Sequence, residues 1–241
     1  MCGRYALDVT GLELARLFGA TLGTGADSSP RLNLAPTMEI LVLRSSNEVA
    51  SRLDLLRWGL VPRWASDPGV GNRMINARSE TVFEKPAFKA AVRERRCLIP
   101  ATLFYEWKRA GGKRVPFGIR PSDEALFVFA GIWERWEGSE GPLETVAILT
   151  TSPNRVMSSI HDRMPVILNP DERARWLDHR PPGEGGPSEM ELRSFLSPVA
   201  DGRLLVHRVS SRVNDARHED SGLMDPIDES PEDPEPPGLF D

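Results

Sequence analysis

Leu126-Phe127-Val128-Phe129-Ala130-Gly131-Ile132-Trp133 is an apolar run of aromatic and β-branched residues, which is typical of a buried strand. A second run, Thr145-Val146-Ala147-Ile148-Leu149-Thr150, follows after a polar interval. Shorter runs of the same kind predict further strands, at 39–43, 53–58, 96–99, 116–119, 165–168 and 204–209. The chain shows no repeat, no Gly-rich phosphate loop and no βαβ alternation. We therefore expect an α+β fold: one domain built on a curved, largely antiparallel, barrel-like β-sheet with short flanking helices.

Short helices are expected between the strands. Thr10-Gly11-Leu12-Glu13 is a capping box that begins a helix, with Leu14, Leu17 and Phe18 on one face. Further helices are predicted at 79–83, 85–92, 153–158, 171–177 and 189–196. Residues 28–36, rich in Pro, Asn and Ser, are predicted to form a loop.

The charge of the chain is unevenly distributed. The 241 residues carry a net charge of -5, but residues 219–241 hold nine acidic residues and no Lys or Arg. Residues 1–218 then carry 30 basic against 26 acidic residues, a net charge of +4. The prolines among the terminal acids predict a disordered acidic tail at 227–241 after a folded domain at 1–226. The mildly basic domain is compatible with a nucleic-acid partner.

Several classes of protein are disfavoured by what the sequence lacks. No apolar stretch is long enough to span a bilayer, and no signal peptide is visible, so we expect a soluble cytoplasmic protein without a membrane partner. Cys97 lies in an apolar run and is expected to be an inert buried thiol. The four histidines have no zinc-type spacing, and we expect neither a metal nor another cofactor.

Cys2 directly follows Met1. Methionine aminopeptidases remove Met1 before a small residue such as cysteine, and removal would give Cys2 a free α-amine beside its thiol. Such a 1,2-aminothiol condenses with an aldehyde to an imine, and the thiol then closes a thiazolidine ring. The ordinary pKa values of both groups leave a reactive fraction near neutral pH. Taken alone, Cys2 is more readily explained as an accident of a frayed terminus.

Three further segments place a chemically able polar residue among apolar neighbours. They are Ile75-Asn76-Ala77-Arg78-Ser79-Glu80, Phe104-Tyr105-Glu106-Trp107-Lys108 and Ser159-Ile160-His161-Asp162-Arg163-Met164-Pro165. Each has a purely structural explanation when taken singly. The amide could cap a helix, the carboxylate could pair with an arginine, and the imidazole could be a satisfied turn residue.

Together with Met1-Cys2-Gly3-Arg4, these segments and their order resemble the SRAP (SOS response-associated peptidase) family, self-crosslinking sensors of abasic sites in single-stranded DNA. The resemblance spans roughly residues 1–226. Other agreeing stretches are Asn33-Leu34-Ala35-Pro36, Trp58-Gly59-Leu60-Val61-Pro62, Asn214 and Gly222-Leu223 with Pro226. The resemblance implies that Cys2 forms the crosslink, that Asn76 and Glu106 support it, and that His161 acts on the ring-opened sugar. It also implies a monomer whose partner is single-stranded DNA containing an abasic site.

The chemistry makes these roles reasonable. Imine formation needs a proton taken from the amine, which we assign to Glu106, since aromatic neighbours are expected to desolvate its carboxyl and raise its pKa. A second proton must reach the departing hydroxyl, and His161 could supply it; His161 could also protonate the sugar ring oxygen and expose the aldehyde. Asn76 gains no charge and is assigned to positioning Cys2.

Contacts to DNA are expected from arginines and tryptophans. Arg4 and Arg78 resemble family DNA contacts and are expected to hold phosphates that flank the lesion. Trp64, and less surely Trp58, could stack on an unpaired base, although a tryptophan after a strand is equally a core residue.

Two other functions stay open from the residues alone. Cys2 and His161 could form the nucleophile system of a thiol peptidase or amidase that removes its own Met1. The chain could also be a non-catalytic single-strand binding module. We expect DNA-protein crosslinking that protects the lesion in the DNA damage response, with an abasic-site lyase reaction as a side activity and peptidase activity limited to autoprocessing.

Overall fold

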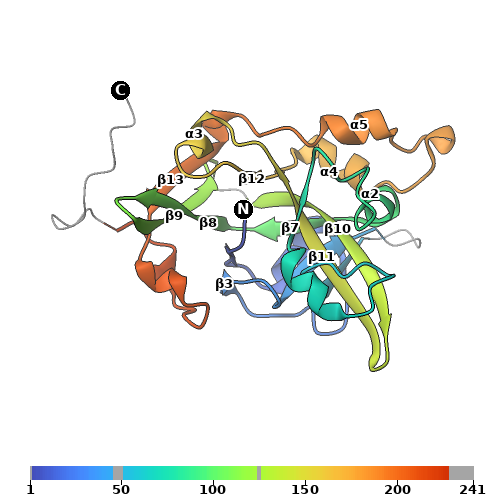
Figure 1. Ribbon diagram of the computed structural model, residues 1–241, viewed down its shortest axis with the longest axis horizontal. Coiled ribbons are helices and arrows are strands. Elements are labelled where there is room, and N and C mark those ends of the chain that lie inside the picture. The colour runs from blue at the N-terminus through green and yellow to red at the C-terminus, as the bar shows by residue number, and fades with distance from the viewer. Residues whose placement is uncertain (1, 46–50, 124–125, 228–241) are drawn as a thin grey trace.

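Five strands close into a β-barrel in the computed structural model, which describes residues 2–45, 51–123 and 126–227 (Figure 1). They are β4 (Glu39–Arg44), β5 (Arg52–Trp58), β7 (Arg96–Ala101), β10 (Phe127–Gly138) and β11 (Gly141–Thr151). Neighbours run antiparallel except where β5 meets β11 in parallel and closes the ring. The two apolar runs that predicted buried strands are β10 and β11, joined as a hairpin. The α+β fold on a barrel-like sheet is confirmed.

A second, antiparallel sheet carries the amino terminus. Its order is β13 (Leu204–Arg208), β9 (Lys113–Pro121), β8 (Leu103–Ala110), β1 (Tyr5–Leu7) and β3 (Arg31–Leu34). Aromatic rings join it to the barrel: Tyr5 lies edge-on to Trp58 at 5.5 Å and to Phe129 at 6.2 Å between centroids. Such pairs contribute about 0.5–1.5 kcal/mol each beyond the burial of their area. The amino-terminal segment therefore leads directly into a strand that is anchored in the core.

Two short strands attach to the far half of β11. β6 (Asn76–Arg78) runs parallel to it, with Asn76 opposite Ile148, and β12 (Met164–Pro165) runs antiparallel. The backbone of Val166 lies between β10 and β11, since it bonds to Ala130 on one side and Leu149 on the other. The predicted site segments around Asn76 and His161 are brought close to one strand in this way. A further short strand, β2 (Thr21–Leu22), pairs with β5.

The predicted capping box begins α1 (Gly11–Phe18), where Thr10 Oγ1 accepts the N–H of Glu13. The expectation that Leu17 shares the buried face is wrong, because the helix packs through Leu14 and Ala15 and leaves Leu17 66% exposed. Four more helices follow predicted ones: α2 (Lys89–Glu94), α3 (Arg155–Ser158), α4 (Pro170–Leu177) and α5 (Glu189–Ser194). Figure 1 shows α2, α4 and α5 grouped on one side of the molecule. Short 3₁₀ segments occur at Pro68–Arg73, Pro182–Glu184, Asp201–Arg203, Ser211–Asn214 and Ser221–Leu223.

Two other predictions from the sequence are wrong. Residues 79–83 form turns instead of a helix, because the N–H of Ser79 is taken by Thr150 O of β11. The expected loop at 28–36 contains strand β3, whose Leu32 and Asn33 N–H groups are satisfied by the Glu219 carboxylate. A contact between residues so far apart in the chain has no local signature.

The acidic tail predicted at 227–241 lies, apart from Ile227, outside the described residues. Within the described ranges no helix has the length and apolar character needed to traverse a membrane.

Candidate active site

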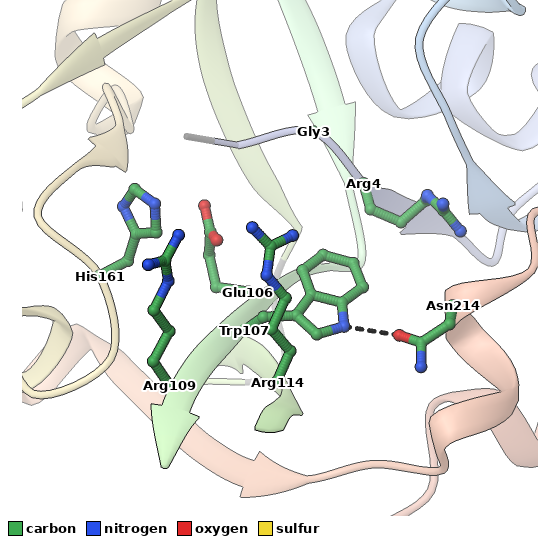
Figure 2. A pocket seen from close by; sticks show the side chains of 8 residues that line it. All are labelled: Gly3, Arg4, Glu106, Trp107, Arg109, Arg114, His161 and Asn214. Carbon is green, nitrogen blue, oxygen red and sulfur yellow. Dashed lines mark hydrogen bonds between the residues drawn. The ribbon is translucent and has the colours of Figure 1, made fainter. Parts of the chain in front are cut away.

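A pocket of about 600 Å³ opens beside the amino-terminal segment (Figure 2). Its lining comes from segments far apart in sequence: Gly3, Arg4, Glu106, Trp107, Arg109, Arg114, His161 and Asn214. Strand pairing brings several of these lining residues together, since β1 lies beside β8 and β8 lies beside β9. Three of the predicted site residues, Arg4, Glu106 and His161, meet here.

Cys2 is fully buried next to this pocket. Its carbonyl oxygen accepts a hydrogen bond from Asn76 Nδ2 at 2.8 Å, so the side chain predicted to position Cys2 contacts it directly. The Oδ1 atom of Asn76 is buried and has no hydrogen-bond partner among the described residues. Burial, and then the charge of Glu106, raise the pKa of the Cys2 thiol well above its usual range. The thiol is therefore protonated at neutral pH.

Glu106 lies on β8 with only 3% of its surface exposed. Burial raises the pKa of its carboxyl from 4.5 to about 7, although a hydrogen bond from the backbone N–H of Trp107 acts in the opposite direction. The carboxyl is thus desolvated as expected, and the cause is its burial. A carboxyl with a pKa near 7 can accept and return a proton at neutral pH.

His161 reaches the pocket from the turn between α3 and β12. Its Nδ1 accepts the N–H of Arg163 at 3.0 Å, so a neutral ring carries its proton on Nε2. Asp162 Oδ1 lies 2.9 Å from the same nitrogen, but it could form a hydrogen bond only if Nδ1 carried a proton. Because the Asp162 carboxylate is 88% exposed and well solvated, we favour the hydrogen bond from the N–H of Arg163. Burial lowers the pKa of His161, which keeps the ring neutral.

The turn that carries His161 is tied to β6 and β11 by Arg163. The guanidinium makes a two-point ion pair with Glu80, whose pKa it lowers, and also donates to Thr150 O. Glu80 follows closely after Asn76 and Arg78 in sequence. The ion pair therefore fixes the turn of His161 relative to β6, the strand whose Asn76 binds the Cys2 carbonyl.

The two predicted phosphate-binding arginines have different surroundings. Arg4 is half-buried, with Nη1 donating to Asn33 Oδ1 at 2.7 Å and to Val213 O at 2.6 Å, yet it still lines the pocket. Arg78 is exposed at the end of β6. Arg4 thus has a structural attachment in addition to its place in the pocket, while Arg78 faces solvent.

The two tryptophans also differ. Trp64 is 63% exposed, as a base-stacking residue must be. Trp58 is fully buried, and its Nε1 donates to Ile75 O at 2.9 Å. The expectation that Trp58 could stack on a base is corrected by this placement, because its ring is enclosed by the core.

Sequence reasoning missed two arginines of the pocket, Arg109 and Arg114. They lie directly opposite each other on β8 and β9. The basic run around Gly111-Gly112 was a signal for them, since two glycines between short strands favour a tight hairpin. Asn214 completes the wall, with Oδ1 accepting the indole N–H of Trp107 at 2.7 Å (Figure 2).

The donors present favour acid-base and covalent chemistry. Within the described ranges no group of three or more His, Cys, Asp or Glu side chains is arranged to hold a metal ion. The site instead combines a buried cysteine held through its carbonyl, a carboxyl with a pKa near 7 and a neutral imidazole. Arginines surround this combination and give the pocket a positive character.

Comparisons with known proteins agree on one family. The family described as SOS response associated peptidase (SRAP) matches residues 1–216. The abasic site processing protein YoaM of Bacillus subtilis (strain 168) is 41% identical over 228 residues, covering 93% of this chain and 98% of that protein. The abasic site processing protein HMCES of Xenopus tropicalis is 29% identical, covering 80% of this chain and 63% of that protein. A crystal structure of a Bacteroides thetaiotaomicron protein has the same fold, with a TM-score of 0.84 at 24% identity, covering 94% of this chain and 100% of that one.

Proposed function

The chain belongs to the SOS response associated peptidase (SRAP) family, and on that premise we propose that it processes abasic sites in single-stranded DNA by bonding covalently to them through Cys2. The observation that carries the proposal is the hydrogen bond from Asn76 to the Cys2 carbonyl, beside the Glu106 carboxyl with its pKa near 7. The names of YoaM and HMCES, both abasic site processing proteins, support the choice of lesion.

The reaction begins once Met1 is removed and the α-amine of Cys2 is free. The amine nitrogen attacks the aldehyde carbon of the ring-opened sugar, a C–N bond forms, and one water leaves as the imine develops. The thiol sulfur then adds to the imine carbon while its proton passes to the nitrogen, which closes the thiazolidine ring. One water is lost in total, and nothing is oxidised or reduced.

Each neighbouring residue has a defined task in this sequence. Glu106 takes a proton from the attacking amine and returns it to the departing hydroxyl, a task suited to a carboxyl with a pKa near 7. His161 donates from Nε2 to the sugar ring oxygen, which favours the open aldehyde. Asn76 holds the Cys2 backbone so that the amine meets the aldehyde in a fixed orientation.

DNA binding is assigned to residues around this centre. Arg4 and Arg78 contact phosphates that flank the lesion, and the exposed ring of Trp64 stacks on an unpaired base. The protein acts as a monomer on single-stranded DNA and is therefore found at the nucleoid when bound. Crosslinking dominates over β-elimination because the thiol traps the imine.

The thiol peptidase or amidase is the weaker candidate. A cysteine hydrolase lowers the pKa of its thiol beside an imidazolium, so that thiolate is present at neutral pH. Here burial raises the pKa of the Cys2 thiol, and burial also lowers that of His161. Both changes disfavour a thiolate-imidazolium pair.

The deciding experiment is intact-mass spectrometry after incubation with a single-stranded oligonucleotide that contains one abasic site, without reductant. We expect a species that lacks Met1 and is heavier by the oligonucleotide minus one water. Cys2→Ser keeps the amine and should yield only an imine that requires borohydride for its capture. A stable, unreduced adduct in Cys2→Ala, or no adduct in a wild-type protein lacking Met1, would overturn the proposal.

A further inference from the structure

The hairpin of β8 and β9 holds two like charges face to face. Arg109 and Arg114 form a directly opposed cross-strand pair, and both side chains are exposed. Like charges directly opposite each other destabilise a sheet. Neither guanidinium forms an ion pair or a side-chain hydrogen bond with another residue in the described ranges. Asp162 lines an adjoining pocket together with Arg109, but within the described residues no ion pair offsets the repulsion between the two guanidinium groups.

Both arginines extend into the pocket that contains Glu106 and His161 (Figure 2). Arg109 lies close enough to His161 to be among the charges that lower the pKa of its imidazole. Glu106, which also lines this pocket, has a pKa near 7 and therefore carries only part of a negative charge at neutral pH, against two full positive charges. The pair is therefore positioned for an anion brought in by the substrate.

The pair is also separate from the predicted contact at Arg78. Arg78 belongs to β6, which pairs with the barrel strand β11, whereas Arg109 and Arg114 belong to the amino-terminal sheet. The two groups approach the site from different sheets. A strand whose abasic sugar lies at Cys2 would meet them with different phosphates.

We propose that Arg109 and Arg114 together bind one backbone phosphate of the DNA strand, next to the abasic sugar and distinct from the phosphate held by Arg78. The inference rests on the proposed function, because it takes the pocket to be the place where the lesion binds. A phosphodiester oxygen pair suits two guanidinium forks, which donate planar, two-point hydrogen bonds. Binding replaces the repulsion between the arginines with attraction to a shared anion.

The test uses non-covalent binding, so that it does not depend on crosslinking. The probe is a short single-stranded oligonucleotide with a tetrahydrofuran residue in place of the abasic sugar, which has no aldehyde to condense. The variant R109Q/R114Q is compared with K113Q/R120Q, which removes the same charge from exposed positions of β9 that do not line the pocket. Affinity is measured against salt concentration, and then with neutral methylphosphonates at single positions around the tetrahydrofuran.

We expect R109Q/R114Q to bind the oligonucleotide about tenfold more weakly. The slope of log affinity against log salt concentration should become less steep by about 0.7, the value for one phosphate contact to a single strand. A methylphosphonate at one position should weaken the binding of the oligonucleotide to wild type and to K113Q/R120Q. The same substitution should not weaken its binding to R109Q/R114Q any further. Equal losses in the two variants, or additive losses at every methylphosphonate position, would overturn the inference.

Failure of the inference and failure of the proposed function give different results. If a natural abasic oligonucleotide forms the Cys2 adduct but no phosphate position couples to the arginines, only the phosphate site is wrong. If one position couples and the natural abasic oligonucleotide forms no adduct, only the covalent function is wrong.

Discussion

Asn76 donates from Nδ2 to the carbonyl oxygen of Cys2 at 2.8 Å, while its Oδ1 has no partner among the described residues. The amide therefore restrains the backbone of Cys2 and keeps an acceptor available for the amine that Met1 removal would create. It does so from β6, which is fixed to β11.

The contact predicts that Asn76→Ala slows adduct formation about 100-fold, because a small displacement of a reacting group from its productive geometry has an effect of that size. Affinity for the tetrahydrofuran oligonucleotide should stay unchanged, since Asn76 is assigned no DNA contact. Single-turnover rates and equilibrium binding measure the two effects. Asn72→Ala, at an exposed position earlier in the same segment, serves as the control. A parallel loss of affinity in Asn76→Ala would contradict a role in positioning.

Glu106 predicts the pH dependence of the reaction. Because its pKa is about 7, the fraction of ionised carboxylate grows through neutral pH, and this adds an inflection near pH 7 to the rise in adduct rate that deprotonation of the α-amine, with an ordinary pKa of about 8, produces by itself. Glu106→Gln should be slower by about 100-fold and lose this inflection. The measurement is the single-turnover rate at a series of pH values. An unchanged inflection in the variant would assign the titration to another group.

The same residue predicts the pH dependence of stability. A carboxyl whose pKa is raised on folding holds its proton more tightly in the folded state, so the free energy of unfolding falls as pH rises from 4.5 to about 7 and is constant above. At about 1.4 kcal/mol per pH unit, the fall is about 3 kcal/mol. Urea unfolding at about pH 5 and about pH 8 should show this fall as the difference between wild type and Glu106→Gln, because burial lowers the pKa of His161 and His179 and their contributions have the opposite sign in both proteins. Equal changes in the two proteins would mean that Glu106 is not responsible.

The barrel could be predicted from sequence because its strands are apolar runs whose signal is local. Strand β3 could not, since its N–H groups depend on Glu219 and its other edge on β1. The sequence also does not distinguish the buried Trp58 from the exposed Trp64. Both lie near the end of one strand, and only the bond from Trp58 to Ile75 O identifies the buried one.

The candidate site shows a similar division. Cys2, Asn76, Glu106 and His161 are predicted from the sequence because their neighbours and their order along the chain resemble the SRAP family. Arg109 and Arg114 face each other only because of the register of β8 and β9. Asn214 enters the site because its segment packs against β8, although the two are more than one hundred residues apart in the sequence. Such relations arise only in the folded chain.

His161 predicts a defect that depends on the substrate. His161→Ala should slow adduct formation on a natural abasic site about 100-fold, because the ring oxygen loses its proton donor. Binding of the tetrahydrofuran oligonucleotide should not change, since that ring cannot open. Because the pKa of the imidazole is lowered, the donor is the neutral ring, and acidification from about pH 8 to about pH 7 should not accelerate the wild-type reaction. Acceleration in that range would indicate an imidazolium donor.

Asn33 holds Arg4 and the segment around Asp215 in place through hydrogen bonds. The side chain is fully buried, and Nδ2 donates to Asp215 O at 2.9 Å and to His218 O at 3.0 Å, while Oδ1 accepts from Arg4. Asn33→Ala leaves these groups without their partner, and we expect a loss of about 2–3 kcal/mol in the free energy of unfolding.

The loss should be concentrated in the segment that Asn33 holds. Faster limited proteolysis within residues 211–224 is expected in Asn33→Ala, together with weaker DNA binding, because Arg4 loses one of its two acceptors and Asn214 lies in the segment that Asn33 holds. Asn33→Asp keeps an acceptor for Arg4 but removes the donor to the two carbonyls. It should therefore retain more DNA affinity than Asn33→Ala while remaining sensitive to protease. If both variants resist proteolysis as well as wild type does, the segment is held by other contacts, such as the ion pair of Arg31 with Glu219.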